Sequence, residues 1–323
     1  MLKHVFGPVP SRRLGRSLGI DPVPLKTCNW NCVYCQLGRT RPLTNDRRSY
    51  VSQDLILGEV ASALEQHTAG DIDWVTFVGS GEPTLHSGLG WMIQQVKSIT
   101  SIPVAVITNG ALLHLPAVRR DLSAADMVLP SLDAGTEALY KSLNRPHPHN
   151  SFSKYVAGLV AFRASYRGQL CVEVMLVHGQ NDTENALRDI ARVLADVDPD
   201  EIHINTPIRP PAETWVQPTN GEGLLRARAI LGDKVRIFTS LEGDYDLGAY
   251  EKVVDAIMAI ITRHPMRQIE LERTLSAWGS GEVQAALEQL IASGRAQRVE
   301  RYGVTFWSSV ESYYPKDNPE CFH

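Results

Sequence analysis

Three cysteines fall within eight residues, in the segment Cys28-Asn-Trp-Asn-Cys32-Val-Tyr-Cys35. The 323-residue chain has five cysteines, and this odd number in a chain without a recognisable signal peptide argues against a disulfide framework. A structural zinc site needs four ligands, and only Cys321 or His4 could add the fourth, although neither has ligand-pair spacing. An iron–sulfur cluster with one iron free of cysteine fits the loop better, and zinc or simple electron transfer is the alternative.

The C-x3-C-x2-C spacing, with Tyr34 directly before the third cysteine, resembles the signature of the radical S-adenosylmethionine (SAM) superfamily. The resemblance implies that Cys28, Cys32 and Cys35 hold a [4Fe–4S] cluster whose fourth iron is chelated by the amino and carboxylate groups of SAM. It also implies a reaction. One electron, from a reducing partner such as flavodoxin or ferredoxin, would cleave SAM to methionine and a 5′-deoxyadenosyl radical that abstracts hydrogen from a substrate.

Six segments carry the short β-branched and aromatic runs that are typical of buried parallel strands. They are Leu18–Val23, Trp74–Gly79, Val104–Thr108, Met127–Ser131, Leu170–Val177 and Glu201–Asn205. Helical patterns lie between them, for example at residues 56–64 after a Ser52/Asp54 start signal and at residues 89–99. We therefore predict an α/β fold for residues 1–240, a partial (β/α)6 TIM-like barrel that is two units short of a closed one.

Polar residues follow several of the expected strands. In the superfamily, a glycine–glutamate–proline loop after the second strand holds the methionine end of SAM, and later strand ends line its adenosyl part. The matching residues here are Gly81, Glu82 and Pro83, then Asn109, Ser131, Asp133, His178 and Asn181, with Tyr34 near adenine. Ordinary turns, helix caps and a core tyrosine are the alternatives for these residues.

Further motifs resemble the iron–sulfur oxidoreductases grouped with the tRNA wyosine synthases. The motifs lie at residues 7–15, 17–19, 35–38, 131–134, 144–146 and 207–211. Wyosine synthases have a second cysteine set and a Schiff-base lysine, whereas only Cys171 and Cys321 remain here. Cys171 is expected to be core, and nothing identifies Lys26 as such a lysine. A tRNA-modifying reaction of this type is therefore an alternative, and RNA, peptide and small-molecule substrates stay open.

Charge is distributed unevenly along the chain. Residues 1–50 contain nine Lys/Arg and two acidic residues, a net charge of +7, which leaves −11 for the remainder of a chain whose total is −4. A basic N-terminal segment indicates an anionic cofactor, substrate or electron donor, with solvated arginines as the alternative. Because a guanidinium suits phosphate or carboxylate, our candidate substrate contacts are Arg12, Arg13, Arg145 and Arg209.

After a linker expected near residues 241–246, the pattern changes to helices alone. Helices are expected at residues 249–263, 268–276 and 282–293, and strands at residues 296–300 and 304–308, which resembles a winged helix over residues 248–314 with a tail at 315–323. The helix in the reading position contains Glu282 and Glu288 and no Lys or Arg, which argues against DNA as a partner. A protein contact, a structural lid and a dimer contact are the alternatives. A redox-sensing regulator that binds nucleic acid through this domain is the competing hypothesis for the whole chain.

Apolar residues make up 43% of the chain and charged residues 21%, as in ordinary globular proteins. The apolar stretches fall short of the roughly 20 residues that span a bilayer. The sequence therefore predicts a cytoplasmic enzyme with no membrane contact.

Overall fold

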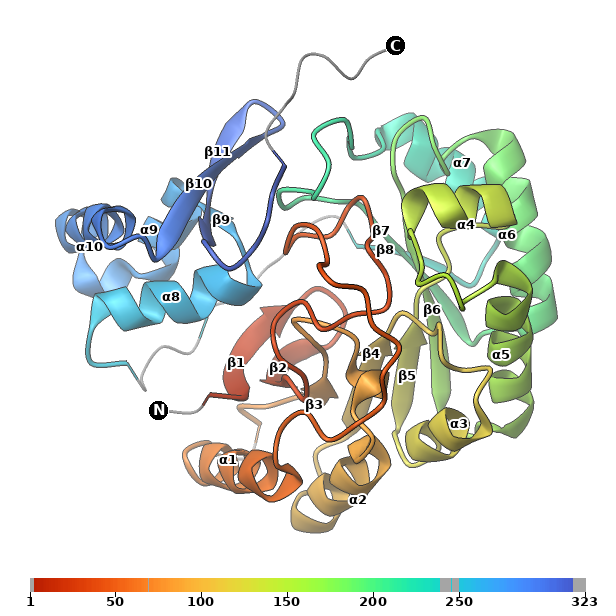
Figure 1. The fold of residues 1–323 in the computed structure, drawn as a ribbon, viewed down its shortest axis with the longest axis horizontal. Helices are drawn as coiled ribbons and strands as arrows, with labels where there is room; N and C mark the ends of the chain where they lie inside the picture. Colours follow the sequence, from red (N-terminus) through yellow and green to blue (C-terminus); the bar gives the residue numbers. More distant parts are fainter. Residues whose placement is uncertain (1–2, 69, 239–244, 246–249, 316–323) are drawn as a thin grey trace.

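An eight-stranded sheet forms the centre of the molecule (Figure 1). The computed structural model describes residues 3–68, 70–238, 245 and 250–315. The strands are β1 (Val5–Ser11), β2 (Gly15–Ile20), β3 (Trp74–Phe77), β4 (Val104–Thr108), β5 (Met127–Pro130), β6 (Gln169–Met175), β7 (Glu201–Asn205) and β8 (Val235–Phe238). Their spatial order follows the sequence, with β1 antiparallel to β2 and all later pairs parallel. The sheet curls into the predicted partial barrel, and β1 and β8 extend it beyond the six expected strands.

Helices cover the outer face of the sheet, one after each of the parallel strands β2, β3, β4, β6 and β7 and two after β5 (Figure 1). They are α1 (Gln53–Glu65), α2 (Leu89–Ile99), α3 (Pro116–Leu122), α4 (Glu137–Leu143), α5 (Phe152–Ser165), α6 (Glu184–Val197) and α7 (Gly221–Leu231). Ser52 caps α1 as predicted, because its side chain accepts a hydrogen bond from the amide of Leu55 at 3.4 Å.

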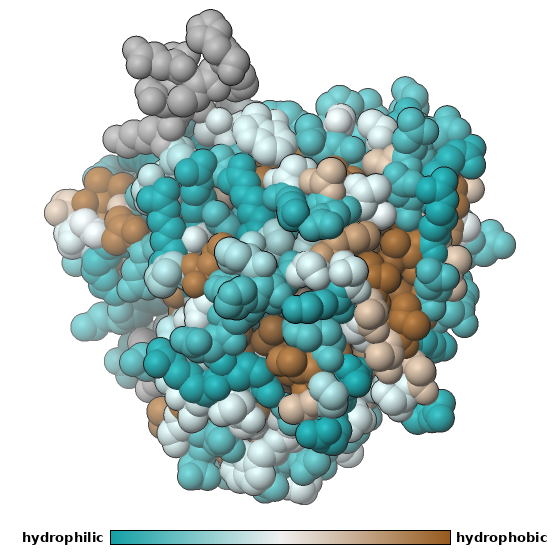
Figure 2. Space-filling view, turned by 45° about the vertical axis from the view of Figure 1, so that its right-hand side comes forward, coloured by the Kyte–Doolittle hydropathy of each residue, from teal (hydrophilic) through white to brown (hydrophobic). Residues whose placement is uncertain are grey.

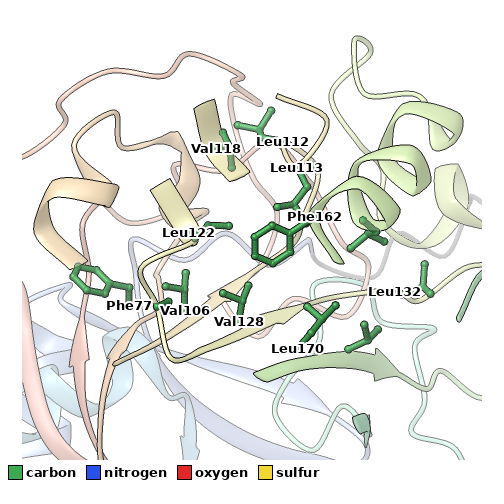
Figure 3. Close-up of a cluster of buried hydrophobic side chains, with 14 of the residues drawn as sticks. Phe77, Val106, Leu112, Leu113, Val118, Leu122, Val128, Leu132, Phe162 and Leu170 are labelled. Atoms are coloured by element: carbon green, nitrogen blue, oxygen red, sulfur yellow. The ribbon is translucent and has the colours of Figure 1, made fainter. Parts of the chain in front are cut away.

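The main core lies between this outer face and the helices (Figure 3). Val106, Val128 and Leu170 point from the strands toward Phe162 of α5. Neighbouring residues along each strand face the barrel interior instead. A second, smaller cluster there contains Leu14, Ala105, Met127, Leu129 and Cys171. Cys171 is fully buried in this cluster, as expected for a core residue.

The turn between β1 and β2 folds into the barrel interior. Leu14 packs against Met127, Leu129 and Cys171, and Arg13 forms an ion pair with Glu173 of β6. The hairpin therefore fills the interior at the N-terminal ends of the parallel strands. The site must lie at the opposite, C-terminal ends, where the loops that follow the strands meet.

The C-terminal unit has its own core and a three-stranded antiparallel sheet in the order β10-β11-β9. Its elements are α8 (Val253–Arg263), β9 (Met266–Arg267), α9 (Gln268–Thr274), the 3₁₀ helix η2 (Ser276–Trp278), α10 (Ser280–Ala292), β10 (Ala296–Arg301) and β11 (Val304–Ser309). The expected helices and hairpin are all present, and β9 adds a third strand. Except for Tyr245, the linker expected near residues 241–246 lies outside the described residues.

This unit packs against the segment that follows β2. The side chain of Gln36 donates to the carbonyl oxygen of Arg263 at 2.8 Å, and the amide of Arg39 donates to the carbonyl oxygen of Tyr313 at 2.8 Å. The guanidinium of Arg263 pairs with Asp21 at 2.5 Å. The cysteine-containing segment therefore lies between the barrel and the C-terminal unit (Figure 1).

The molecular face in Figure 2 is mostly hydrophilic, with apolar side chains in several separate groups. Within the described part of the chain, each helix is too short or too polar to cross a membrane.

Candidate active site

The three clustered cysteines lie on the loop that leaves the C-terminal end of β2. Trp30 fixes this loop, because its indole is fully buried and contacts the rings of Tyr140 and Tyr155 at centroid distances of 5.4 and 5.6 Å. Its Nε1 also donates to the hydroxyl of Tyr140 at 3.1 Å. Cys28, Cys32 and Cys35 are all free and half-buried. Burial raises the pKa of the Cys28 thiol to about 12 and also raises that of Cys32. An aromatic anchor therefore holds a loop whose thiols lie close to the core.

The number of ligands bears on the choice between zinc and a larger cluster. A structural zinc ion needs four ligands, and the loop itself supplies three cysteines. Of the two suggested fourth ligands, His4 lies at the start of the chain, where its backbone amide donates to Glu59 at 2.7 Å, and Cys321 lies outside the described residues.

Lys26 lies near the site, as its place in the sequence indicates, and it also contacts the cysteine loop directly, which was not predicted. Its ammonium group donates to Cys35 Sγ at 3.1 Å and to the carbonyl oxygen of Gly38 at 2.8 Å. Burial lowers the pKa of Lys26, but the cysteine thiols and the hydrogen bond to Cys35 outweigh it and raise the pKa above its ordinary value. Lys26 thus places a positive charge beside a sulfur ligand. Its position two residues before Cys28 was the signal available in the sequence.

The Gly-Glu-Pro loop follows β3 and packs directly on the cysteine loop. The amide of Glu82 donates to the carbonyl oxygen of Thr27 at 2.8 Å, and the amide of Lys26 donates to the carbonyl oxygen of Ser80 at 2.6 Å. A Cβ atom at Gly81 would overlap the carbonyl carbon and oxygen of Thr27. Glycine at 81 is therefore required by this close approach. Pro83 then begins the 3₁₀ helix η1 (Pro83–Leu85).

The carboxylate of Glu82 is buried and ties β3 to the end of β4. Oε1 accepts from the amide and hydroxyl of Thr84 and from the hydroxyl of Thr108, at 3.0, 2.5 and 2.5 Å. Oε2 accepts from the amide of Asn109 at 2.7 Å. Burial raises the pKa of Glu82, and these hydrogen bonds oppose that rise. Because Oε2 accepts a single hydrogen bond among the described residues, it keeps capacity for another donor.

Asn109 connects this loop to the cysteines. Its side-chain amide donates to Asn29 Oδ1 at 2.7 Å and lies 3.7 Å from Cys28 Sγ. Weak N–H···S contacts of this kind are among the devices that tune a cluster's reduction potential. The structure therefore brings Asn109, Glu82 and Cys28 together, as the sequence analysis expected.

A second buried carboxylate lies on the other side of the cysteine loop, after β5. Asp133 Oδ2 accepts hydrogen bonds from the hydroxyl of Tyr34 and, at 2.7 Å, from Asn144, and Oδ1 accepts from the amide of Met175 at 2.8 Å. The same Asn144 amide nitrogen lies 3.9 Å from Cys32 Sγ. Burial raises the pKa of Asp133, against these hydrogen bonds. In the sequence, Asn144 stands out only as part of a family-like motif, and its contact with Cys32 is evident only in the fold.

The remaining candidates differ in how free their polar atoms are. The Asn181 side chain is fully engaged: it donates to the carbonyl oxygens of Asp133 and Met175 at 2.9 and 2.8 Å and accepts from the amide of Val177 at 2.7 Å. The half-exposed side chain of His178 lies 3.1 Å from Asp182. Ser131 uses its backbone carbonyl to accept from the hydroxyl of Tyr155. Asn181 therefore fixes the loop after β6, whereas no hydrogen bond of the described residues occupies the Ser131 hydroxyl.

The four candidate arginines do not converge on one place. Arg145 lies 2.5 Å from Glu213, which also forms a two-bond pair with Arg39, both bonds at 2.7 Å. Burial raises the pKa of Glu213, but these two arginines outweigh it and hold the pKa below its ordinary value. Arg12, Arg13 and Arg209 instead line one cavity inside the barrel. Arg145 is thus a structural partner of Glu213, and the other three arginines share a site.

Another polar cluster in the barrel interior was not expected from the sequence. The ligand-type atoms of Cys171, Glu201 and His203 lie within 4.8 Å of one another, because the register of β6 and β7 pairs Cys171 with Glu201. His203 Nε2 lies 2.9 Å from Glu201, and the neighbouring Arg13 further disfavours a positive charge on His203, whose pKa is lowered first by burial. This buried cationic neighbour weakens the case for a metal ion there.

Comparison with known proteins identifies the family. The family description "Radical SAM superfamily" matches residues 23–194, which contain the cysteine loop and the Gly-Glu-Pro loop. The chain belongs to the radical SAM superfamily. This superfamily consists of enzymes that use a [4Fe–4S] cluster and SAM.

Three relatives are between 34% and 42% identical to this chain. A UPF0026 protein of Methanocaldococcus jannaschii is 34% identical over 94% of this radical SAM chain and 94% of its own length. A UPF0026 protein of Synechocystis sp. is 37% identical over 64% of this chain and 76% of its own length. A GTPase Obg of Brachyspira hyodysenteriae is 42% identical over 70% of this chain but only 33% of its own length.

Solved structures share the fold at low sequence identity. A radical SAM methyltransferase from Sphaerobacter thermophilus has a TM-score of 0.52 at 16% identity and covers 69% of this chain and 67% of its own. The structure of TYW1 with a lysine–pyruvate adduct has a TM-score of 0.50 at 16% identity and covers 67% of this chain and 72% of its own. Streptococcus suis SuiB bound to SAM has a TM-score of 0.52 at 14% identity and covers 73% of this chain and 52% of its own. The partial barrel is thus a radical SAM fold.

Replacing Gly81 by alanine tests the contact between the two loops. The new methyl group overlaps the Thr27 carbonyl, so we expect a loss of about 1–3 kcal/mol in the free energy of unfolding, measured by chemical denaturation. Gly58→Ala in α1 is the matched control, because a Cβ there meets nothing within 4 Å and should stabilise the helix by about 0.5–1 kcal/mol. Equal stability of the two variants would contradict the proposed close contact.

Replacing Lys26 by methionine tests the role of its charge. The variant keeps the length of the side chain but removes the donor to Cys35, so we expect less iron and sulfide per chain after anaerobic reconstitution and a lower reduction potential of any cluster formed. Lys141→Met, on the exposed face of α4, is the control. Iron content and potential unchanged from wild type would show that the Lys26 ammonium group does not act on the cluster.

Proposed function

We propose that this protein reductively cleaves SAM and uses the resulting 5′-deoxyadenosyl radical to abstract a hydrogen atom from a substrate in the barrel. The observation that carries the proposal is the direct packing of the cysteine loop on the Gly-Glu-Pro loop through Thr27, Gly81 and Glu82. This contact places the three-cysteine loop next to the loop that holds the methionine end of SAM in the superfamily. A bound [4Fe–4S] cluster supplies the electron transfer.

The chain's own residues have distinct roles in this proposal. Cys28, Cys32 and Cys35 hold the cluster, and Glu82 with the backbone around Gly81 receives the ammonium group of SAM. Asn109 and the Ser131 hydroxyl face the adenosyl part. The remaining candidates position other residues of the site. Asp133 orients Tyr34, and the loops that carry the site are shaped by Pro83, His178 and Asn181.

The electron and atom balance requires an external reductant. One electron from a flavodoxin or ferredoxin enters the sulfonium, the C5′–S bond breaks, and methionine leaves. The 5′-deoxyadenosyl radical then takes one hydrogen atom to give 5′-deoxyadenosine and a substrate radical. The barrel interior excludes bulk water from this step, and we place the reaction in the cytoplasm, where such reductants occur.

The domain boundaries that we propose are residues 1–240 for the catalytic barrel, 248–314 for a winged-helix-like domain and 315–323 for a tail. Charge argues against DNA binding by the second domain, since α10 contains no Lys or Arg. Of the basic residues near the hairpin, Arg301 is buried, and its guanidinium donates to the carbonyl oxygen of Pro211 at 3.2 Å. We therefore favour a lid or positioning role over the alternative of a redox-sensing nucleic-acid regulator.

A wyosine-type reaction is the second candidate within the enzyme class. The likeness to TYW1 concerns the fold. Among the described residues, Cys171 is the one cysteine outside the loop, and it is buried. The described residues therefore offer no second three-cysteine site. Lys26 is the lysine that we find beside the loop. Its ammonium group donates hydrogen bonds to Cys35 and to the carbonyl oxygen of Gly38, which counts against a Schiff-base role.

The reaction can be tested with the wild-type protein and three variants. After anaerobic reconstitution and dithionite reduction, wild-type protein should convert SAM to 5′-deoxyadenosine, measured by chromatography. Cys32→Ala should lose both the cluster absorbance and the product. Glu82→Gln should retain the absorbance but bind SAM about tenfold more weakly, because a hydrogen bond to a charged group is lost. Glu137→Gln, on the exposed surface of α4, is the control. An intact wild-type cluster that gives no 5′-deoxyadenosine would overturn the proposal.

A further inference from the structure

A cavity lies inside the barrel where β1, β2 and β3 face the C-terminal unit. Ser17 and Thr76 form part of its wall, and Gln36 from the cysteine loop and Ser80 from the Gly-Glu-Pro loop lie at its edge. It therefore borders both loops of the proposed reaction site. A molecule bound there would lie beside the place where SAM is cleaved.

The C-terminal unit forms one side of this cavity. Arg263 and His264, at the end of α8, line it from that side, as the placement of α8 beside β1 in Figure 1 shows. Arg263 is fixed by its ion pair with Asp21 at 2.5 Å and by stacking on Phe6, with 4.5 Å from its guanidinium carbon to the ring centroid. The C-terminal unit makes a further contact with the barrel through the hydroxyl of Tyr302, which donates to the carbonyl oxygen of Pro207 at 2.8 Å.

Four arginines line the cavity, and two of them have a carboxylate partner among the described residues. Arg13 pairs with Glu173, and Arg263 pairs with Asp21. Arg12 donates to the carbonyl oxygen of Phe238 at 3.4 Å, and Arg209 donates to that of Pro265 at 2.6 Å. Within the described ranges, neither Arg12 nor Arg209 has a carboxylate in ion-pair distance. Among these residues, the two guanidinium groups therefore share the cavity without a counter-charge in contact.

The electrostatics of these groups are unfavourable without an anion. Burial, together with the charge of Arg209, lowers the pKa of Arg12 to about 10. Burial and the charges of Arg209 and Arg263 lower the pKa of His264 to about 3, and its buried Nε2 has no hydrogen-bond partner among the described residues. Burial raises the pKa of Glu270, but the hydrogen bonds and charge of Arg267, together with the charge of Arg209, outweigh it and hold that pKa below its ordinary value. Glu270 is paired with Arg267 at 2.8 Å. An anion in the cavity would relieve this repulsion.

We propose that the cavity binds a small molecule through a phosphate or carboxylate group held by Arg12 and Arg209, and that this molecule is the substrate of the radical reaction. The substrate role rests on the proposed function, whereas the anion site does not. Arginine forks suit both groups. The C-terminal unit covers this side of the barrel, which favours a small molecule over an RNA or a peptide.

The anion site can be tested without the cluster or SAM. Inorganic phosphate and acetate are titrated separately into the full chain in a chloride-matched buffer, with binding followed by calorimetry. At least one of the probes should bind saturably at one site. Arg12→Gln and Arg209→Gln should each weaken that binding about tenfold or more, and Arg120→Gln, on the exposed face of α3, should not. The preferred probe tells a phosphate ester from a carboxylate.

Two further variants separate lost binding from lost folding. Arg12→Lys and Arg209→Lys keep the charge and should retain part of the affinity that the glutamine variants lose. The anion site would be overturned if neither probe bound wild type saturably. It would also be overturned if both glutamine variants bound the probe as strongly as wild type does. If added tRNA displaces the bound probe, the result would instead support a macromolecular substrate and contradict the small-molecule inference. Formation of 5′-deoxyadenosine is measured independently, so failure here is distinguishable from failure of the proposed reaction.

Discussion

The contact between the cysteine loop and the Gly-Glu-Pro loop is the constraint on which the rest of the site depends. Two backbone hydrogen bonds, from Glu82 to Thr27 and from Lys26 to Ser80, join loops that leave adjacent parallel strands. The approach is so close that position 81 admits only glycine without displacement. Because parallel strands bring their C-terminal ends to one edge, the sheet itself delivers both loops to the same place.

Buried carboxylates extend this arrangement along the sheet. Glu82 ties the end of β3 to Thr108 and Asn109 at the end of β4, and Asp133 links the loop after β5 to Tyr34 of the cysteine loop. Each carboxylate is compensated by several hydrogen bonds, as burial of a charge requires. These hydrogen bonds fix the loops of the site relative to the sheet, and such preorganisation lowers the cost of binding a cofactor.

Sequence reasoning predicted the parts whose signal is local. The cysteine spacing, the six strand runs and the helix after Ser52 are all present, because each is set by neighbouring residues. The β1 strand was missed since Pro8 and Pro10 interrupt its alternation, and the Arg145–Glu213 pair joins positions 68 residues apart. The cluster of Cys171, Glu201 and His203 depends on the register of β6 and β7, which no single segment encodes. The cavity that Arg12 and Arg209 share with Arg263 likewise follows only from the docking of the C-terminal unit.

The central claim is that three cysteines hold a cluster whose remaining iron is open to SAM beside the Gly-Glu-Pro loop. Low-temperature electron paramagnetic resonance of the dithionite-reduced protein, recorded with and without SAM, tests it most directly. Direct ligation of SAM changes the environment of one iron, so we predict a [4Fe–4S]⁺ signal whose g values shift when SAM is added. A reduced cluster with an identical spectrum in saturating SAM would contradict the account.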